Sequence, residues 1–243
     1  MIFWKILLAH VLTDFIFQPD QLAENKEKVR VLLIHSLIFF LLSVVILLPT
    51  FSYHTIIALA LLASFHGLVD YSKNLIQKRT GKTGKSLWLY FLGDQVLHVL
   101  GIGAVIFFLD QGSSHVWIDV LSTYWSKPSI FLFSSLFVLI VFGGGFFIGI
   151  LCRGFLGGLD SEKRPGIERA GRVIGILERS LVLTAVLFSK MEFIGYIFAA
   201  KSIARYPEMK EGSHFAEYYL IGTLTSISIA FFGGLLLKYL LGW

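Results

Sequence analysis

Histidine and aspartate recur four residues apart in three apolar segments of this chain. Residues i and i+4 lie on one face of a helix, so each pair points an imidazole and a carboxylate in the same direction. Together these groups bind zinc, manganese or iron, and they also exchange protons. The set comprises His10 with Asp14, His66 with Asp70, Asp94 with His98, and a further histidine in an apolar segment, His35.

The segments that must position these residues are long enough to cross a membrane. Of the 243 residues, 56% are hydrophobic and 15% are charged, and the apolar blocks are about 18 to 23 residues long. We predict an all-α polytopic transmembrane bundle of about eight helices. The first block carries His10 and Asp14 and lacks a small-residue cleavage site, so we expect a span and not a signal peptide. The expected helices cover residues 2–17, 31–48, 55–76, 87–109, 129–152, 173–189, 191–206 and 214–241.

Basic residues predict the orientation of these helices. The net charge is +5, but Lys and Arg sit in short connections between apolar blocks, which is typical of a membrane protein and not of a nucleic-acid-binding one. Sixteen lie in the odd-numbered connections, against Lys127 and Lys190 in the even-numbered ones. The positive-inside rule therefore predicts that both termini are extracytoplasmic. The five prolines are all expected in connections. The sixteen are Lys26, Lys28, Arg30, Lys73, Lys78, Arg79, Lys82, Lys85, Arg153, Lys163, Arg164, Arg169, Arg172, Lys201, Arg205 and Lys210.

With this orientation, all seven His and Asp residues fall in a slab roughly 12 Å thick in the cytoplasmic half of the membrane. Unpaired carboxylates at that depth cost on the order of 2.5 kcal/mol or more each, so cations or donors must compensate them. One interpretation is that each pair forms a private hydrogen bond that helps helices pack. The other is a shared site that binds a divalent metal, with zinc favoured over manganese or iron, or that relays protons.

The chain divides near the connection 110–128, which contains His115, Trp117 and Trp125. We predict a four-helix His/Asp domain over 1–109 and a second four-helix domain over 129–243. The His-x-x-x-Asp-aromatic pattern occurs at residues 10–15 and again at 66–71, so the first domain is either a tandem repeat of helix pairs or carries a coincidental match.

The second domain carries a different group of charges inside its apolar segments. Arg179, Lys201 and Arg205 form a candidate clamp for a substrate phosphate. Glu178 and Glu217 are either spare proton carriers or salt-bridge partners of these cations. The glycines at 143–145 and 149 are expected to allow close helix packing.

Several of these segments resemble a known family. They are His10-Val11-Leu12-Thr13-Asp14-Phe15, His35, His66-Gly67-Leu68-Val69-Asp70 followed by Lys73, and Asp94-Gln95-Val96-Leu97-His98. They resemble the bacterial membrane-protein family catalogued as domain of unknown function 3307, most specifically over the first 110 residues. The resemblance implies residence in a bacterial cytoplasmic (inner) membrane and supplies no established chemistry. A looser likeness is to membrane-bound metal-dependent hydrolases.

The leading hypothesis is a divalent-metal-dependent hydrolase that acts on a phosphorylated or esterified membrane lipid. In it, the seven His and Asp residues bind or orient the metal, and Asp70, Asp94 and Glu178 are the catalytic candidates. One alternative is a transporter or channel that uses the same cluster as a relay for protons or cations. Another is a non-catalytic assembly factor whose basic loops recruit a cytoplasmic partner. Association into a homo-oligomer is compatible with each of these.

Overall fold

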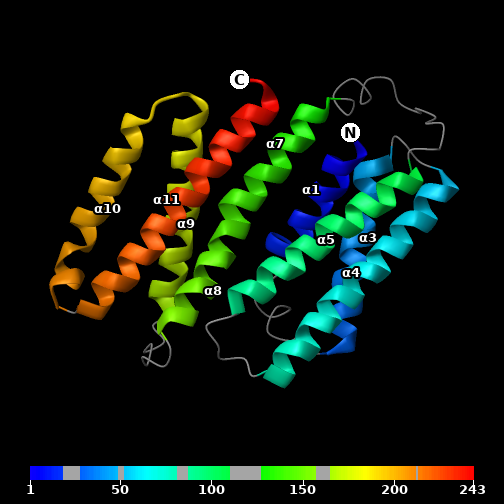
Figure 1. Cartoon of the computed structure of the whole chain (residues 1–243), viewed down its shortest axis with the longest axis horizontal. Helices are drawn as coiled ribbons and strands as arrows, with labels where there is room; N and C mark the ends of the chain where they lie inside the picture. The colour runs from blue at the N-terminus through cyan, green and yellow to red at the C-terminus, as the bar shows by residue number, and fades with distance from the viewer. Residues whose placement is uncertain (19–27, 49–51, 81–86, 110–126, 157–164, 212) are drawn as a thin grey trace. The chain divides into compact units, whose positions relative to one another are not determined.

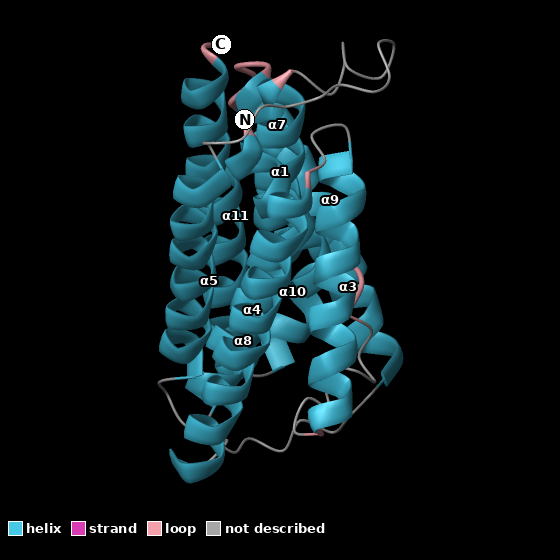
Figure 2. Ribbon diagram, turned by 90° about the vertical axis from the view of Figure 1, so that its right-hand side faces the viewer, coloured by secondary structure: helices cyan, strands magenta, loops and turns pink. Residues whose placement is uncertain are grey.

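The computed structural model describes residues 1–18, 28–48, 52–80, 87–109, 127–156, 165–211 and 213–243, and within these ranges it contains helices and loops and no strands (Figure 2). A helix satisfies every backbone N–H and C=O within itself, which a segment in lipid must do. The described residues form eight continuous helical runs, one for each predicted helix. The all-α prediction is confirmed. The loop that contains His115, Trp117 and Trp125 lies outside the described residues.

The chain forms two compact units, of which the first comprises residues 1–82 and 89–138. Its helices are α1 (Ile2–Phe15), α3 (Val29–Leu47), α4 (Tyr53–Thr80), α5 (Leu87–Leu109) and α7 (Pro128–Val138). Helix α1 packs against α3 and α7, and α3 packs beside α4 (Figure 1). The Phe65 ring of α4 packs on Gly101 of α5, where a Cβ would lie 2.5 Å from the ring.

Helix α1 is held against α7 by polar contacts as well as apolar ones. The Ser135 hydroxyl donates a hydrogen bond to the Trp4 carbonyl over 2.9 Å. The fully buried Lys5 ammonium lies 5.2 Å from the centre of the Phe131 ring, a cation–π distance. These contacts fix the helix that carries His10 and Asp14.

The second unit comprises residues 83–88 and 139–243. It contains a π-helical turn (Leu139–Gly143) that continues α7 into α8 (Gly144–Leu156), followed by α9 (Pro165–Leu187), α10 (Glu192–Glu211) and α11 (Ser213–Leu241). Helix α11 packs against α8, α9 and α10. The expectation that all prolines fall in connections is wrong at Pro207, which lies inside α10, and at Pro128 and Pro165, which are the first residues of α7 and α9. Proline suits the first position of a helix, because the N–H that it lacks has no partner there, whereas Pro207 removes one hydrogen bond and crowds the carbonyl four residues before it, with four helical residues left to follow.

Five helical segments of the described chain are long and apolar enough to cross a membrane: Val29–Leu47, Tyr53–Arg79, Leu87–Ile106, Pro128–Cys152 and Ala216–Leu241. They are consistent with a multi-pass membrane protein. Helix α1, with 14 residues, is too short to meet this criterion, and α9 and α10 are more polar.

Candidate metal centre

Four helices of the first unit bring histidine and aspartate into one buried cluster. Helix α1 supplies His10 and Asp14, α3 supplies His35, α4 supplies His66 and Asp70, and α5 supplies Asp94 and His98. Each of the seven residues is at most 6% exposed. The contacts that follow cross between helices, so the interpretation in which each pair is private to its own helix does not describe this cluster.

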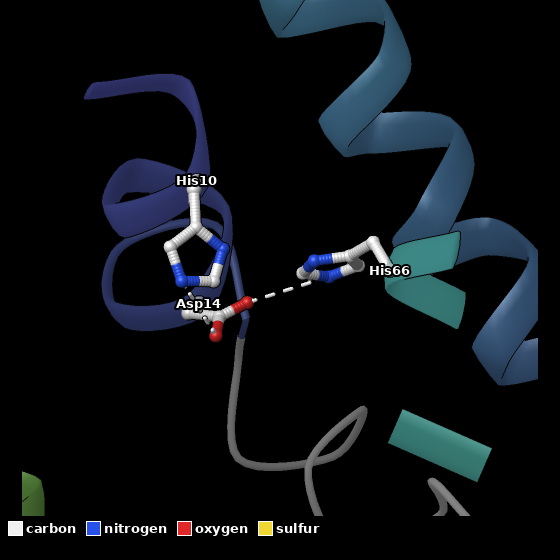
Figure 3. Close-up of side chains that lie close together, drawn as sticks. All are labelled: His10, Asp14 and His66. Carbon is white, nitrogen blue, oxygen red and sulfur yellow. Dashed lines mark ion pairs between the residues drawn. The ribbon is translucent and has the colours of Figure 1, made fainter. Parts of the chain in front are cut away.

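The Asp14 carboxylate lies between three histidines. Its Oδ1 accepts a hydrogen bond from His35 Nε2 over 3.1 Å and lies 3.6 Å from His66 Nε2. Its Oδ2 lies 3.8 Å from His10 Nε2 and accepts a hydrogen bond from Gln95 Nε2 over 3.2 Å. Figure 3 shows the carboxylate between His10 and His66, which approach it from different helices. Asp14 therefore joins contributions from α1, α3, α4 and α5.

Asp70 is fully buried and faces the same histidines from α4. Its Oδ2 lies 3.4 Å from His35 Nε2 and 3.9 Å from His66 Nε2. Its Oδ1 accepts a hydrogen bond from Lys73 Nζ over 3.3 Å. His35 and His66 thus lie between two carboxylates, one from α1 and one from α4.

Asp94 completes the cluster from α5. Its Oδ2 accepts a hydrogen bond from Lys73 Nζ over 2.7 Å and another from Gln95 Nε2 over 3.3 Å. His98 Nδ1 donates to the Asp94 backbone carbonyl over 2.8 Å. Because that bond places the proton of a neutral imidazole on Nδ1, the lone pair of His98 is on Nε2, the arrangement found in metal-ligating histidines.

Buried atoms without a hydrogen bond show what the cluster lacks. Both ring nitrogens of His66, Nε2 of His98 and Oδ1 of Asp94 have no hydrogen-bond partner within the part of the chain that the structure describes. Leaving a buried polar atom unsatisfied costs about 1–3 kcal/mol. A metal ion accepts lone pairs from such atoms and would remove this cost.

Three overlapping groups within the cluster have ligand atoms close enough together to hold one ion. In each group, all ligand atoms lie within 4.8 Å of one another. Mixed imidazole and carboxylate donors suit zinc, manganese and iron. The site can therefore hold a metal ion, and its donor set alone does not select one of the three. The groups are His10, Asp14 and His66; His35, His66 and Asp70; and Asp70, Asp94 and His98.

Three of the histidines pack beside apolar side chains. His10, His66 and His98 surround a gap too small for a water molecule together with Phe39, Leu62, Phe65 and Ile102. Phe65 is also 37% exposed on the surface of this unit, so one side chain both borders this gap and reaches the outer surface.

The sequence did not predict a role in the cluster for Lys73 or Gln95. Lys73 was counted among the basic residues of a connection, but it lies in α4 and is 19% exposed. Its position three residues after Asp70, on the same helix face, was the available signal. Gln95 bridges the carboxylates of Asp14 and Asp94 and accepts a hydrogen bond from His10 Nε2 over 3.3 Å. An amide in an apolar segment is a weaker signal, because such residues also stabilise helix packing.

The second unit places its charged residues in a different environment. Glu178 forms an ion pair with Lys201 over 2.5 Å, as one of the two sequence interpretations expected. Arg179 is buried, and its Nε donates to the carbonyl of Val141, within the π-helical turn, over 2.7 Å. Glu217 is exposed.

Glycines make room for the Arg179 guanidinium. A Cβ at Gly145 would lie 2.6 Å from Arg179 Nη2, and one at Gly175 would lie 3.0 Å from Nη1. These glycines let α8 and α9 close around an arginine, a more specific role than the general helix packing predicted. Binding of a substrate phosphate by Arg179, Lys201 and Arg205, and proton transfer by Glu178, stay predictions.

Comparison with known proteins supplies a family. No curated protein and no solved structure is similar to the chain. A family model described as protein of unknown function (DUF3307) matches residues 2–125, which include every member of the His/Asp cluster together with Lys73 and Gln95. Because this match covers just over half of its length, the chain belongs to the DUF3307 family.

Proposed function

We propose that the His/Asp cluster binds a divalent metal ion and that the protein uses this ion to hydrolyse an esterified or phosphorylated membrane lipid. The observation that carries the proposal is the buried convergence of four imidazoles and three carboxylates from four helices. His66 is its centre, because it belongs to two of the three potential ligand groups and both its ring nitrogens lack hydrogen bonds among the described residues.

The charge of the cluster supports a divalent ion. Three aspartates contribute three negative charges, and Lys73 contributes one positive charge through its contacts with Asp70 and Asp94. With neutral histidines, the three aspartates and Lys73 together carry a formal charge of −2 in a buried site. Buried charges are costly unless they are paired. One divalent cation would balance this charge and would accept a lone pair from one ring nitrogen of His66.

Hydrolysis is supported by the size of each potential ligand group, because three protein donors leave a coordination position for water, as in catalytic zinc sites. A bound divalent ion activates a water molecule and polarises a phosphoryl or carbonyl oxygen. In this proposal His10, Asp14 and His66 ligate the metal, and His35 and Asp70, the neighbouring group with His66, ligate it or accept a proton. Asp94 and His98 complete the cluster on the side of Lys73.

A lipid substrate is supported by the apolar side chains of Phe39, Leu62, Phe65 and Ile102, which lie beside three of the histidines. An acyl or polyprenyl chain would pack against these side chains once they move apart, and its polar head would meet the metal. Phe65 is partly exposed on the surface of the unit, the side from which a lipid would approach.

Metal analysis tests the centre. The protein is purified in mild detergent and its metals are quantified by mass spectrometry, alongside a His66→Ala/Asp70→Asn variant. Exposed His54, also on α4, gives a matched His54→Ala control. We expect about one divalent ion per chain in the wild type and the control, and loss in the double variant. Metal-free wild type that does not take up added Zn²⁺, Mn²⁺ or Fe²⁺ would refute the centre.

Turnover tests the hydrolase. Metal-loaded protein is incubated with phospholipids and polyprenyl phosphates in mixed micelles, and released phosphate, head groups and fatty acids are measured. We expect product with the wild type and none with the double variant or after chelation. A stoichiometric metal centre that hydrolyses none of these esters would reject the hydrolase and leave the metal site in place.

A proton relay is the second candidate, and the close succession of four imidazoles favours it. Ring centres lie 5.0 Å apart between His35 and His66, 4.2 Å between His66 and His98, and 4.8 Å between His98 and His10. Such a row can pass protons without a metal. In metal-free liposomes, a relay would produce pH-driven proton flux that His66→Ala abolishes, whereas a metal hydrolase would produce none.

A further inference from the structure

Lys73 lies where two of the cluster's carboxylates meet. Its ammonium is 2.7 Å from Asp94 Oδ2 on α5 and 3.3 Å from Asp70 Oδ1 on its own helix α4. Both carboxylates are almost completely shielded from solvent, whereas the lysine side chain is 19% exposed. The ammonium therefore bridges α4 and α5 at the edge of the buried cluster.

The same two carboxylates, with His98, form one of the three groups able to hold an ion. A metal bound there would lie between Asp70 and Asp94, the place that the ammonium occupies, and two cations repel each other strongly at such a distance. In dinuclear enzymes the two ions are about 3.5–4 Å apart and share bridging carboxylates. Asp70 is common to two of the three groups, as such a bridge requires.

Two ligand atoms in this part of the cluster lack a hydrogen bond. Asp94 Oδ1 and His98 Nε2 are buried and form no hydrogen bond within the described residues. Lys73 contacts Oδ2 of Asp94 and leaves Oδ1 without a hydrogen bond. The lysine thus supplies a positive charge there without using all the ligands.

We infer that Lys73 takes the place of a second metal ion and limits the centre to one. The inference rests on the proposed metal centre and adds its stoichiometry. The ammonium of Lys73 lies against Asp70 and Asp94 as a second divalent ion would in a two-metal site. A neutral side chain at position 73 therefore frees Asp70, Asp94 and His98 to bind a second ion beside the first.

The test is metal stoichiometry in Lys73→Met, which keeps the length of the side chain and removes its charge. Wild type and variant are saturated with Mn²⁺, passed through a desalting column and analysed for manganese per chain. We expect one ion in the wild type and two in Lys73→Met. Lys73→Arg keeps a cation at the site, and Lys78→Met removes an exposed cation from the same helix; both controls should bind one.

Paramagnetic resonance gives a second readout. A single Mn²⁺ ion yields a six-line spectrum, whereas two ions about 4 Å apart couple and lose it. We expect the six-line spectrum in the wild type and the coupled spectrum in Lys73→Met. Adding Asp94→Asn to Lys73→Met removes a ligand of the second ion and should restore one ion and the six lines. If Lys73→Met is not recovered as folded protein, Lys73→Gln replaces it with the same expectation of two ions.

The outcomes separate this inference from the proposed function. Wild type that binds no metal refutes the proposed centre itself. Wild type with one ion and a neutral variant with one or none overturns the inference alone, because Lys73 would then be an ordinary ion-pair partner. Wild type with two ions overturns it as well and leaves the metal centre standing.

Discussion

The carboxylate of Asp14 contacts four neighbouring side chains. Three histidines and Gln95 lie within 3.8 Å of its carboxylate oxygens. A carboxylate at this point can serve a metal as a ligand and can orient imidazoles that are ligands themselves.

We predict that Asp14→Asn removes the metal. An amide keeps the size of the side chain but carries no negative charge. Loss of an outer-shell partner of a metal typically lowers affinity about 10- to 100-fold, and loss of a ligand lowers it at least as much. Metal per chain after purification should fall to about a tenth of the wild-type value or less.

Thr13→Val is the matched control for this prediction. Thr13 is adjacent on α1 and fully buried, and its hydroxyl donates to the Ala9 carbonyl of its own helix over 2.8 Å. Its replacement should leave the metal content unchanged. Retention of wild-type metal by Asp14→Asn would show that Asp14 is not part of the centre.

The sequence indicated this cluster because helix geometry converts a spacing of four residues into a shared face. Similar depth in the membrane then suggested that His35 belongs with the three pairs. The role of Lys73 could not be predicted in the same way, because a basic residue near the end of a span also fits the positive-inside rule. Lys73 forms its hydrogen bond with Asp94 of α5, and a contact between two helices cannot be predicted from a local sequence pattern.

At the scale of elements, small residues set how closely helices approach. In the second unit, α11 packs on α9 at Gly234, where a Cβ would lie 2.9 Å from Val186 Cγ1 and 3.2 Å from Leu183 Cδ1. Both neighbours are buried and have short branched side chains, so they have little room to move. Without strong hydrophobic driving force in lipid, such close packing holds membrane helices together.

We predict that Gly234→Ala destabilises the second unit by about 1–3 kcal/mol, the usual cost of overpacking. Gly222→Ala on the same helix is the control, because its Cβ would meet only Cys152 Sγ at an ordinary 3.6 Å. Thermal midpoints measured by size-exclusion chromatography after heating should fall for Gly234→Ala and stay near wild type for Gly222→Ala. Equal midpoints for all three proteins would contradict the packing argument.

Helix positions were predictable because apolar blocks and prolines limit them, but helix ends and irregular turns were not. The π-helical turn at Leu139–Gly143 has no local sequence signal, and its Val141 carbonyl accepts a hydrogen bond from Arg179 of α9. Pro207 was read as a helix end and lies within α10. A contact between helices accompanies the π-helical turn. At Pro207 the helix continues past a residue that usually ends one.

At the scale of the whole molecule, α1 decides the topology. Its 14 residues measure roughly 21 Å at 1.5 Å per residue, less than a hydrocarbon core of about 30 Å. Helices α9 and α10 are consecutive, so they either both cross the membrane or both stay on one side of it. In either case the chain returns to the same side, and the side on which the C-terminus lies does not change. Eight crossings place both termini on one side, whereas the five long apolar segments alone place them on opposite sides.

We predict that both termini are extracytoplasmic, as the distribution of basic residues requires. Ile2→Cys and Gly242→Cys are each introduced into a Cys152→Ala background, which removes the single native cysteine. A membrane-impermeant maleimide added to intact cells should label both. Labelling of Gly242→Cys but not of Ile2→Cys until the membrane is opened would show that α1 does not cross.

X-ray absorption at the metal edge tests the central claim, a divalent ion ligated by the His/Asp cluster, most directly. Zinc-loaded protein should show a first shell of nitrogen and oxygen at about 2.0–2.2 Å, with the outer scattering of imidazole rings. His66→Ala should lose part of the imidazole signal, and His54→Ala should keep it. A first shell without imidazole, an imidazole signal unchanged in His66→Ala, or wild-type protein that retains no zinc would contradict the account.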